Sequence, residues 1–340
     1  MTDANNEPIR VAVAMNFSDE IMEQLREISP RLQIDRYYPN VPESIWHDVE
    51  VLYTLNRFPL PEQAPRLRWI QLHFAGLDHA LREPIMQAED VEVTTASGVH
   101  SIHIAEFSLA MMLAFMYKLP LLMELKNKAE WPETRAQVFA PHGLRALTLG
   151  IAGYGSIGRE LARMADSLGM RVLATKRDVK HPADTSGYQE EGLGDPTGDI
   201  PARLYPPQAL ASMASECDFL VILTPLTKET RHSVDEHVLK AMKKTAVIIN
   251  VARGAVIDEA ALISALANGT IAGAALDVFE EEPLPKSSPL WNLDNVIISP
   301  HISGNNQFYL QRAASIFAAN LKRYLENEPL LNRLERERGY

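Results

Sequence analysis

Residues 147–165 read LTLGIAGYGSIGRELARMA, and this stretch decides the fold class. The apolar run Leu147–Ala152 is typical of a buried strand, and Ser156–Leu168 has helical periodicity. Three glycines between and within them follow the pattern G-x-G-x-x-G, at Gly153, Gly155 and Gly158. Glycines at this spacing permit a tight turn, the close approach of a pyrophosphate, and packing of the helix on the strand. The stretch therefore predicts a strand–turn–helix unit whose free helix amides bind a dinucleotide.

The same alternation of a short apolar run and a helical pattern recurs along the chain. Ten runs rich in Val, Ile and Leu predict strands, at Arg10–Met15, Val51–Leu55, Arg68–Leu72, Val91–Thr95, Leu147–Ala152, Arg171–Thr175, Phe219–Leu223, Ala246–Val251, Ala272–Val278 and Val296–Ser299. Helices are predicted at Ser18–Ile28, Ser156–Leu168, Asp258–Ala267 and Tyr309–Glu326. Apolar runs without polar alternation are typical of parallel strands that are buried on both faces. The pattern therefore predicts an α/β protein with parallel sheets.

Composition limits the class of protein. A length of 340 residues favours about two domains. The 33 Lys and Arg against 44 Asp and Glu give a net charge of −11, which disfavours nucleic acid as a partner. The single cysteine, Cys217, excludes an internal disulfide framework and a Cys-based zinc site. The N-terminus lacks a signal-peptide pattern, and the apolar run Phe107–Met123 is short for a membrane span, so we expect a cytoplasmic protein without a membrane partner.

The end of the strand Arg171–Thr175 bears on the choice of cofactor. An NAD site usually carries an acid about 20 residues after the glycine motif, but here the chain continues with Lys176 and Arg177. A basic pair suits a 2′-phosphate, so NADP(H) is preferred; NAD(H), with Asp178 at the ribose, is the alternative. The segment Lys180–Pro207, rich in Pro, Gly and acids, is expected to be a long surface loop, without a role or near the adenosine end of the cofactor.

Further polar residues follow predicted strands downstream. Arg253, the acid run Glu280–Glu282 and His301 each lie just beyond a strand end. In open parallel sheets, ligands bind outside the carboxyl ends of the strands. An Arg there can hold a substrate carboxylate, and a carboxylate can orient an imidazole that protonates a carbonyl oxygen. Each of these residues alone is more typical of a surface, but together they indicate an acid–base site.

The region Leu147–Gly304 resembles the D-isomer-specific 2-hydroxyacid dehydrogenases, among them glyoxylate/hydroxypyruvate reductase-like and phosphoglycerate dehydrogenase-like members. The matching pieces are LTLGIAGYGSIGRELA, TPLTKETRHSV, INVARGAVIDEAALISAL, IAGAALDVFEEEPLP, SPLWNLDNVIISPHISG and NLKRYLENEPLLN. Upstream, FAGLDHA and HIAEFSLAMMLAF also fit. The likeness covers most of the chain, and its motifs are specific in combination.

The resemblance implies hydride transfer between NAD(P)H and a 2-oxo acid, which gives a D-2-hydroxy acid. It implies a catalytic Arg, Glu and His at Arg253, Glu282 and His301. Glu282 is selected from the three neighbouring acids because the catalytic Glu of the family precedes a Pro. His301 would be the general acid/base paired with Glu282, and Arg253 would bind the substrate carboxylate and polarise the carbonyl.

The resemblance also implies binding residues around this trio. The backbone of Ala75 and Gly76, in the loop His73–Asp78, would clamp the substrate carboxylate, and Asp277 would hold the nicotinamide carboxamide. From the motifs and the resemblance together, the candidate cofactor-binding residues are Gly153, Gly155, Ser156, Ile157, Gly158, Lys176, Arg177, Thr224, Pro225, Thr230, Val251, Ala252, Asp277, His301 and Gly304. No metal site is expected.

The implied architecture is two Rossmann-like or flavodoxin-like domains with parallel sheets and a cleft between them. Residues 1–98 with 305–340 would form the substrate domain, and 99–304 the dinucleotide-binding domain. An arm at about 101–145, with an apolar helix from His103 to Leu125, would make a homodimer; the alternative buries this helix inside one subunit. Two other functions stay open, a cofactor-sensing scaffold like the C-terminal-binding protein corepressors and a formate- or phosphite-type dehydrogenase.

Four residues near the expected pocket each allow two interpretations. Arg57 could meet a second substrate carboxylate or be a surface residue. His73 and Phe74 could line the pocket or simply pack. Trp131 could close over the substrate of the partner subunit or belong to a core.

Overall fold

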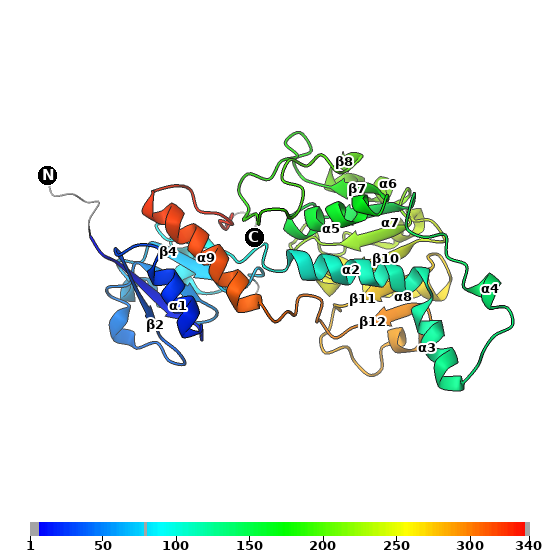
Figure 1. Ribbon diagram of the computed structural model, residues 1–340, viewed down its shortest axis with the longest axis horizontal. Helices are drawn as coiled ribbons and strands as arrows, with labels where there is room; N and C mark the ends of the chain where they lie inside the picture. The colour runs from blue at the N-terminus through cyan, green and yellow to red at the C-terminus, as the bar shows by residue number, and fades with distance from the viewer. Residues whose placement is uncertain (1–6, 78–79, 337–340) are drawn as a thin grey trace. The chain divides into compact units, whose positions relative to one another are not determined.

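The computed structural model describes residues 7–77 and 80–336, which form two compact α/β units, each built on a parallel sheet (Figure 1). Unit 1 comprises Met1–Val99, Ser186–Tyr188 and Asn306–Tyr340, and unit 2 comprises His100–Thr185 and Gln189–Asn305. The described strands form a five-stranded sheet in unit 1 and a seven-stranded sheet in unit 2. The predicted fold class, two α/β domains with parallel sheets, is confirmed.

The sheet of unit 1 has the order β2-β1-β3-β4-β5. Its strands are β1 (Ile9–Ala14), β2 (Leu32–Arg36), β3 (Val51–Thr54), β4 (Trp69–Leu72) and β5 (Glu92–Thr94). The helices α1 (Asp19–Arg26) and α9 (Tyr309–Leu325) pack on one face through a core that includes Met22 and Phe317. A second apolar core, with Trp46 and Leu67, covers the other face.

The sheet of unit 2 has the order β12-β11-β10-β9-β6-β7-β8. Its strands are β6 (Thr148–Ala152), β7 (Arg171–Thr175), β8 (Arg203–Tyr205), β9 (Phe219–Ile222), β10 (Val247–Asn250), β11 (Gly273–Leu276) and β12 (Val296–Ile298). The helices α2 (Ser101–Met116) and α5 (Ser156–Ser167) cover one face, whereas α6 (Leu210–Ala214), α7 (Glu236–Ala241) and α8 (Glu259–Ala267) cover the other. The strand order reverses between β6 and β9, and a ligand crevice is expected at the carboxyl ends of the strands flanking such a point.

The prediction of a single helix from His103 to Leu125 is wrong. The helix α2 ends at Met116, and α3 (Leu119–Lys128) follows after a bend of 60°. Lys118 has a left-handed backbone with φ 50°, and Pro120 lies in the first turn of α3, so the backbone cannot continue as one helix. The short helix α4 (Arg135–Val138) comes next, and Figure 1 shows α3 and α4 projecting from the sheet of unit 2.

Among the residues that the structure describes, no single helix is long and apolar enough to cross a membrane. The bent pair of α2 and α3 passes by length and composition when the two helices are joined.

The segment Lys180–Pro207 was expected to be a loop, but it contains a strand and ordered turns. Its strand β8 pairs in parallel with β7 and extends the sheet of unit 2. Its residues Ser186–Tyr188 belong to unit 1, where the Asn332 amide donates to the Ser186 carbonyl at 2.9 Å. The Tyr188 amide donates to Asn332 Oδ1 at 2.9 Å. These three residues are therefore hydrogen-bonded within unit 1.

Candidate active site

The glycine motif forms the turn from β6 into α5, and two of its three glycines are required sterically. Gly153 has φ 108°, and a Cβ there would lie 2.9 Å from the Leu223 carbonyl carbon. A Cβ on Gly158 would lie 2.5 Å from the Gly153 carbonyl oxygen. At Gly155, the N-cap residue of α5, a Cβ would meet no described atom within 4 Å. Open space over the amino end of a helix fits the phosphates of a dinucleotide.

The loop that leaves β9 lies beside this turn. The Leu223 amide donates to the Ala152 carbonyl at 2.8 Å, which ties the ends of β6 and β9 together. The loop is closed on itself, because the Thr230 hydroxyl donates to the Pro225 carbonyl at 2.6 Å. Thr224 follows Leu223 directly, and its amide nitrogen would lie 3.0 Å from a Cβ on Gly153. Thr224 thus lies next to the glycine turn, and the bond between Thr230 and Pro225 fixes the shape of the loop that follows it.

Arg253 lies in the loop after β10, and the loop is shaped by a buried amide. Asn250 is 1% exposed; its Nδ2 donates to the Arg253 carbonyl at 3.1 Å, and its Oδ1 accepts from the Ala252 amide at 3.2 Å. The half-buried Arg253 guanidinium donates to the Ala252 carbonyl at 2.8 Å. A Cβ on Gly254 would lie only 1.9 Å from the Phe279 carbonyl carbon. Glycine therefore lets the Arg253 loop touch the loop that carries the acid run.

Asp277 joins three strand ends. The Asp277 amide donates to the Asn250 carbonyl at 3.0 Å, and the His301 amide donates to the Asp277 carbonyl at 2.9 Å. Its fully buried carboxylate accepts from the Ser299 hydroxyl at 2.6 Å and from two loop amides, those of Ile302 and Ser303, each at 2.9 Å. Burial opposes ionisation, but these hydrogen bonds outweigh it and lower the pKa of the Asp277 carboxyl. Asp277 thus holds the loop that carries His301.

His301 and Glu282 form a hydrogen-bonded pair beyond β12 and β11. His301 Nδ1 lies 2.8 Å from Glu282 Oε2, and the Phe279 amide donates to Glu282 Oε1 at 3.0 Å. His301 has a left-handed backbone with φ 54°. Both side chains keep solvent access, with exposed fractions of 50% and 36%. His301 Nε2 has no hydrogen-bond partner among the described residues, so this atom can meet a ligand.

The neighbouring acids have different surroundings. Glu280 Oε1 lies 2.6 Å from His232 Nε2, and the Glu280 amide donates to the Glu259 carboxylate at 3.1 Å. Glu281 is exposed and makes no hydrogen bond or ion pair with any residue in the described part of the chain. Of the run Glu280–Glu282, the structure brings Glu282 to the imidazole of His301.

The basic pair Lys176 and Arg177 follows β7 at the same edge of the sheet. The Lys176 amide donates to the Tyr205 carbonyl at 2.9 Å, so its backbone is fixed by β8. Asp178 is engaged in a local turn, where its carboxylate accepts from the Lys180 amide at 3.1 Å and pairs with His181 Nδ1 at 2.6 Å. The strand end thus presents two basic side chains, with the Asp178 carboxylate engaged in the turn that follows them.

Residues 109–303 match the family model for the NAD binding domain of D-isomer specific 2-hydroxyacid dehydrogenases. The chain belongs to this family. A glyoxylate reductase from Aeropyrum pernix is 34% identical to it over 339 residues, which cover 96% of each chain. A D-isomer specific 2-hydroxyacid dehydrogenase from Xanthobacter autotrophicus Py2, solved in complex with NADPH and MES, matches with a TM-score of 0.77 and 27% identity over 98% of this chain and 100% of its own.

A further solved structure is an NADPH-dependent glyoxylate/hydroxypyruvate reductase from Sinorhizobium meliloti, in complex with NADP and sulfate. It has a TM-score of 0.73 and 25% identity, and the match covers 98% of this chain and 100% of that one. The resemblance inferred from the motifs is confirmed. The protein is a 2-hydroxyacid dehydrogenase that interconverts 2-oxo and 2-hydroxy acids with NAD(P)H.

Several residues that shape this dehydrogenase site had no predicted role. Asn250 is polar at the end of an otherwise apolar strand, which was the available signal for its buried position. Gly254 follows Arg253 directly, but the need for glycine arises from Phe279, 25 residues away in the chain, a contact that spacing does not reveal. Ser299 and the loop amides act through Asp277.

In unit 1, the predicted residues Ala75 and Gly76 lie half-buried in the loop after β4. Asp78, the end of the expected clamp loop, is outside the described residues. His73 packs rather than opening to solvent, because it is 4% exposed and its Nδ1 lies 2.7 Å from the Tyr53 hydroxyl oxygen. Phe74 and Arg57 are exposed.

Two other residues differ in exposure. Cys217 is buried, and burial raises the pKa of its thiol to about 12. Trp131 is 83% exposed in this chain, so its interpretation as a core residue is wrong.

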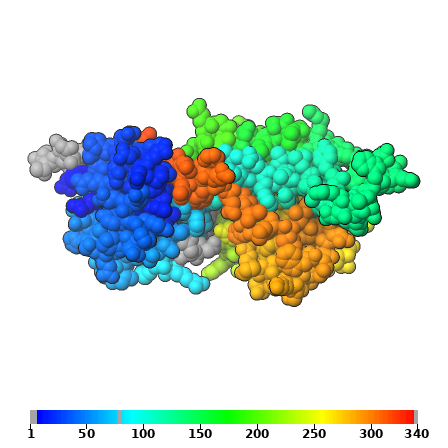
Figure 2. Space-filling model, turned by 60° about the horizontal axis from the view of Figure 1, so that its bottom comes forward, coloured from blue at the N-terminus to red at the C-terminus, as the bar shows by residue number. Residues whose placement is uncertain are grey.

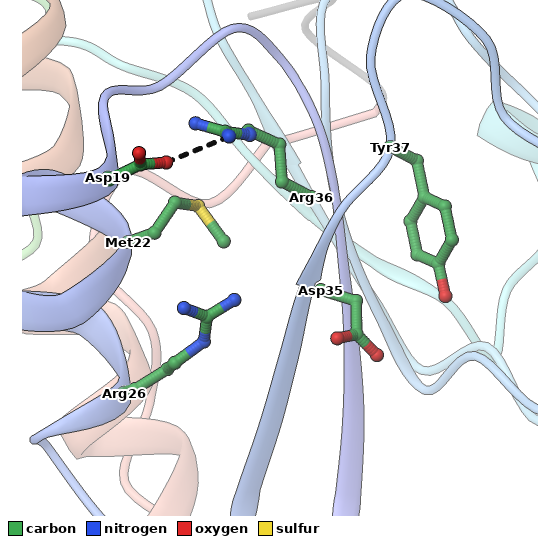
Figure 3. Close-up of a pocket in the computed structure, with 6 residues that line it drawn as sticks. All are labelled: Asp19, Met22, Arg26, Asp35, Arg36 and Tyr37. Carbon is green, nitrogen blue, oxygen red and sulfur yellow. Dashed lines mark ion pairs between the residues drawn. The ribbon is translucent and has the colours of Figure 1, made fainter.

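A charged cavity of about 520 Å³ lies elsewhere, in unit 1, between α1 and β2 (Figure 3). It is lined by Asp19, Met22, Arg26, Asp35, Arg36 and Tyr37. Arg36 and Asp19 pair at 2.8 Å, and Arg26 Nε donates to the Ile34 carbonyl at 3.0 Å. These charges are largely satisfied by the protein itself. Across residues 7–77 and 80–336, no group of three or more His, Cys, Asp or Glu side chains could hold a metal ion.

Proposed function

We propose that this dehydrogenase reduces a small 2-oxo acid, of the glyoxylate or hydroxypyruvate kind, to the D-2-hydroxy acid, with NADPH preferred. The observation that carries the proposal is the His301–Glu282 pair at 2.8 Å, placed by Asp277 at the same sheet edge as Arg253 and the glycine turn. The glyoxylate reductase among the relatives supports the substrate class. The NADPH-bound neighbour and the basic pair at Lys176 and Arg177 support the cofactor.

The acid–base step follows from the orientation of His301. The reduced nicotinamide, when bound, supplies the hydride that C2 of the oxo acid accepts. Because Nδ1–H of the imidazolium donates to Glu282, Nε2–H is left to give its proton to the substrate oxygen as it becomes a hydroxyl. The Glu282 carboxylate stabilises the imidazolium and fixes its orientation. Arg253 binds the carboxylate of the substrate and polarises the keto oxygen.

The cofactor would lie along the carboxyl edge of the sheet in unit 2. The amides of Ser156, Ile157 and Gly158 open α5 and would hold the pyrophosphate, and Lys176 with Arg177 would hold the 2′-phosphate. Residues at the other strand ends would hold the nicotinamide half, at Thr224, Pro225, Thr230, Val251, Ala252, Asp277 and Gly304. The site thus extends across the ends of β7, β6, β9, β10, β11 and β12.

We further propose roles for the two units. Residues 99–304 would bind the dinucleotide, and residues 1–98 with 305–340 would bind the substrate. The backbone of Ala75 and Gly76 would hold the substrate carboxylate. Both amides follow a strand end, the usual place for a ligand loop in a parallel sheet.

The protein is also proposed to be a homodimer formed through an arm at about 101–145. Its exposed large apolar side chains include Tyr117, Leu119, Leu122, Met123 and Trp131, with exposed fractions from 41% to 83%. In Figure 2 this blue-green segment lies at the surface of unit 2. Large apolar side chains exposed along one segment are typical of a protein interface. A cytoplasmic location is part of the proposal, and a single free cysteine suits a reducing compartment.

The test is an initial-rate panel with glyoxylate, hydroxypyruvate, pyruvate and phenylpyruvate, each with NADPH and with NADH. Turnover of the small acids with an NADPH preference is expected. An NADH preference would contradict the role of the basic pair and keep the chemistry. Tight cofactor binding without turnover would favour the cofactor-sensing scaffold. A parallel assay gives the protein formate and phosphite with NAD(P)+, and their oxidation would favour that type of dehydrogenase.

A further inference from the structure

Two buried charged side chains that the mechanism does not use hold the segment between β7 and β8 against α5. Arg159 is 3% exposed and Asp195 is 5% exposed. Arg159 lies in the first turn of α5, directly after the last glycine of the motif. One terminal nitrogen of its guanidinium donates to the Asp195 carbonyl, and the other donates to the Pro182 carbonyl at 2.6 Å. A single side chain thus binds both arms of the segment, residues 181–184 and residues 195–198.

The Asp195 carboxylate connects the same segment to the glycine turn. Its Oδ2 accepts from the Tyr154 hydroxyl at 2.6 Å, and Tyr154 lies between the first two glycines of the motif. Its oxygens also accept from three amides of its own segment, those of Gly198, Asp199 and Ile200, each at 3.1 Å. An acceptor with this many donors holds the backbone around it in one conformation.

The two arms of the segment also touch each other. Gly198 has φ 80°, and a Cβ there would lie 2.6 Å from the Pro182 carbonyl oxygen. The Asp184 amide donates to the Pro196 carbonyl at 3.0 Å. The conformation of residues 181–184 therefore depends on residues 195–198, and both depend on Arg159 and Asp195.

The first arm in turn holds Lys176. The Lys176 ammonium donates to the His181 carbonyl and, at 3.4 Å, to the Ala183 carbonyl. An ammonium has three N–H donors, so this arrangement leaves one for another acceptor. Burial, followed by the positive charge of Arg159, lowers the pKa of the Lys176 ammonium. The lysine is therefore held by the segment rather than extended freely into solvent.

We propose that Tyr154, Arg159 and Asp195 are positioning residues for NADPH selection. They fix the carbonyls of residues 181–183, which hold the Lys176 ammonium where it meets the 2′-phosphate. This inference rests on the proposed use of NADPH and identifies the residues that set the affinity for its 2′-phosphate. A free lysine has to be ordered when it binds a phosphate, and ordering a long side chain beforehand removes a cost that corresponds to roughly a 3- to 10-fold change in affinity.

The test measures binding by calorimetry on the full chain, with adenosine 2′,5′-bisphosphate and 5′-AMP as probes. The two probes differ in the 2′-phosphate and report on the adenosine end alone. Asp195→Asn is expected to weaken bisphosphate binding about 3- to 10-fold and to leave AMP binding unchanged. The matched control is Asp199→Asn, which makes the same change of charge four residues away on an exposed side chain.

The control separates positioning from long-range electrostatics. Removal of a negative charge near a phosphate site would tighten bisphosphate binding, so a charge effect has the opposite sign to the expected result. Asp199→Asn should therefore bind the bisphosphate as well as the parent or slightly better. In a Lys176→Met background, Asp195→Asn should cause no further loss, because the residue that it positions is absent.

Three outcomes would overturn the inference. Asp195→Asn could match Asp199→Asn, it could weaken both probes equally, or its effect could persist in full without Lys176. If Lys176→Met leaves the discrimination between the probes unchanged, Lys176 does not bind the 2′-phosphate and the inference fails. The proposed preference for NADPH fails separately, if the parent itself binds the two probes equally well. Tyr154→Phe removes one hydrogen bond to Asp195 without a change of charge, and it replaces Asp195→Asn should that variant not fold.

Discussion

Glu282→Gln separates the charge of the Glu282 carboxylate from its shape. The amide has the same size, and its oxygen can still accept from the Phe279 amide, which now lies 3.0 Å from Oε1. The NH2 group then takes the place of Oε2, 2.8 Å from His301 Nδ1. In the protonated imidazole that the reduction needs, Nδ1 is also a donor, so two donors would face each other.

The size of the effect follows from the bond that is lost. A hydrogen bond to a charged group contributes about 1.5–3 kcal/mol. This bond supports the imidazolium, and its loss should lower kcat/KM for reduction by roughly 10- to 150-fold near neutral pH. Binding of NADPH should change little, because Glu282 is outside the proposed cofactor contacts.

The assay is initial-rate reduction of glyoxylate with NADPH, together with cofactor binding followed by fluorescence. Glu281→Gln is the matched control: it makes the same substitution on the adjacent exposed side chain and should keep the parent rate. A rate for Glu282→Gln within about threefold of the control would refute the reasoning that the carboxylate supports the imidazolium.

Three further predictions concern the scaffold. Gly254→Ala should lower the free energy of unfolding in urea by about 1–3 kcal/mol or more, because its Cβ would meet the Phe279 backbone at 1.9 Å; an unchanged midpoint would contradict this packing. The lowered pKa of Asp277 means that its ionised form stabilises the fold above its ordinary value of 3.8, and that this stability is lost as the pH falls through the folded-state pKa. Urea unfolding at decreasing pH should therefore show a steeper loss below about pH 4 in the parent than in Asp277→Asn, and parallel curves would speak against it. If the parent sediments as the proposed homodimer, Leu122→Glu should convert it into monomers in sedimentation velocity, and a variant that sediments as a dimer would remove α3 from the interface.

The central strands could be predicted from the sequence because their burial on both faces leaves an uninterrupted apolar run. Strands β2 and β8 were missed, and both lie at a sheet edge. The residues Leu32–Arg36 alternate and end in two exposed charged positions, and Arg203–Tyr205 spans three residues. Only two positions of β2 and one of β8 are buried, so the composition of these two strands resembles that of a loop.

The break between α2 and α3 had a visible signal in Pro120, but the apolar run across it suggested one helix. Proline is tolerated in the first turn of a helix, so the same residue fits either an interruption or a new start. The left-handed backbone of Lys118 ends α2, so a new helix starts at Leu119. This conformation cannot be predicted from the presence of a lysine.

At the site, strand ends could be predicted, whereas the contacts between loops could not. The order of the sheet places residues after β10, β11 and β12 at one edge, which is why Arg253, Glu282 and His301 could be grouped. The hydrogen bonds through Asp277 and the close approach at Gly254 depend on loop conformations, and these are set by atoms far away in the chain. The same holds for Arg159 and Asp195, which are 36 positions apart.

The most direct test of the account is a single-turnover measurement of hydride transfer in His301→Ala, with NADPH bound beforehand and glyoxylate added. We expect a rate about 10²- to 10⁴-fold below the parent at saturating NADPH, because a general acid is removed. A rate near that of the parent would show that the proton comes from another group and would contradict the assignment of His301.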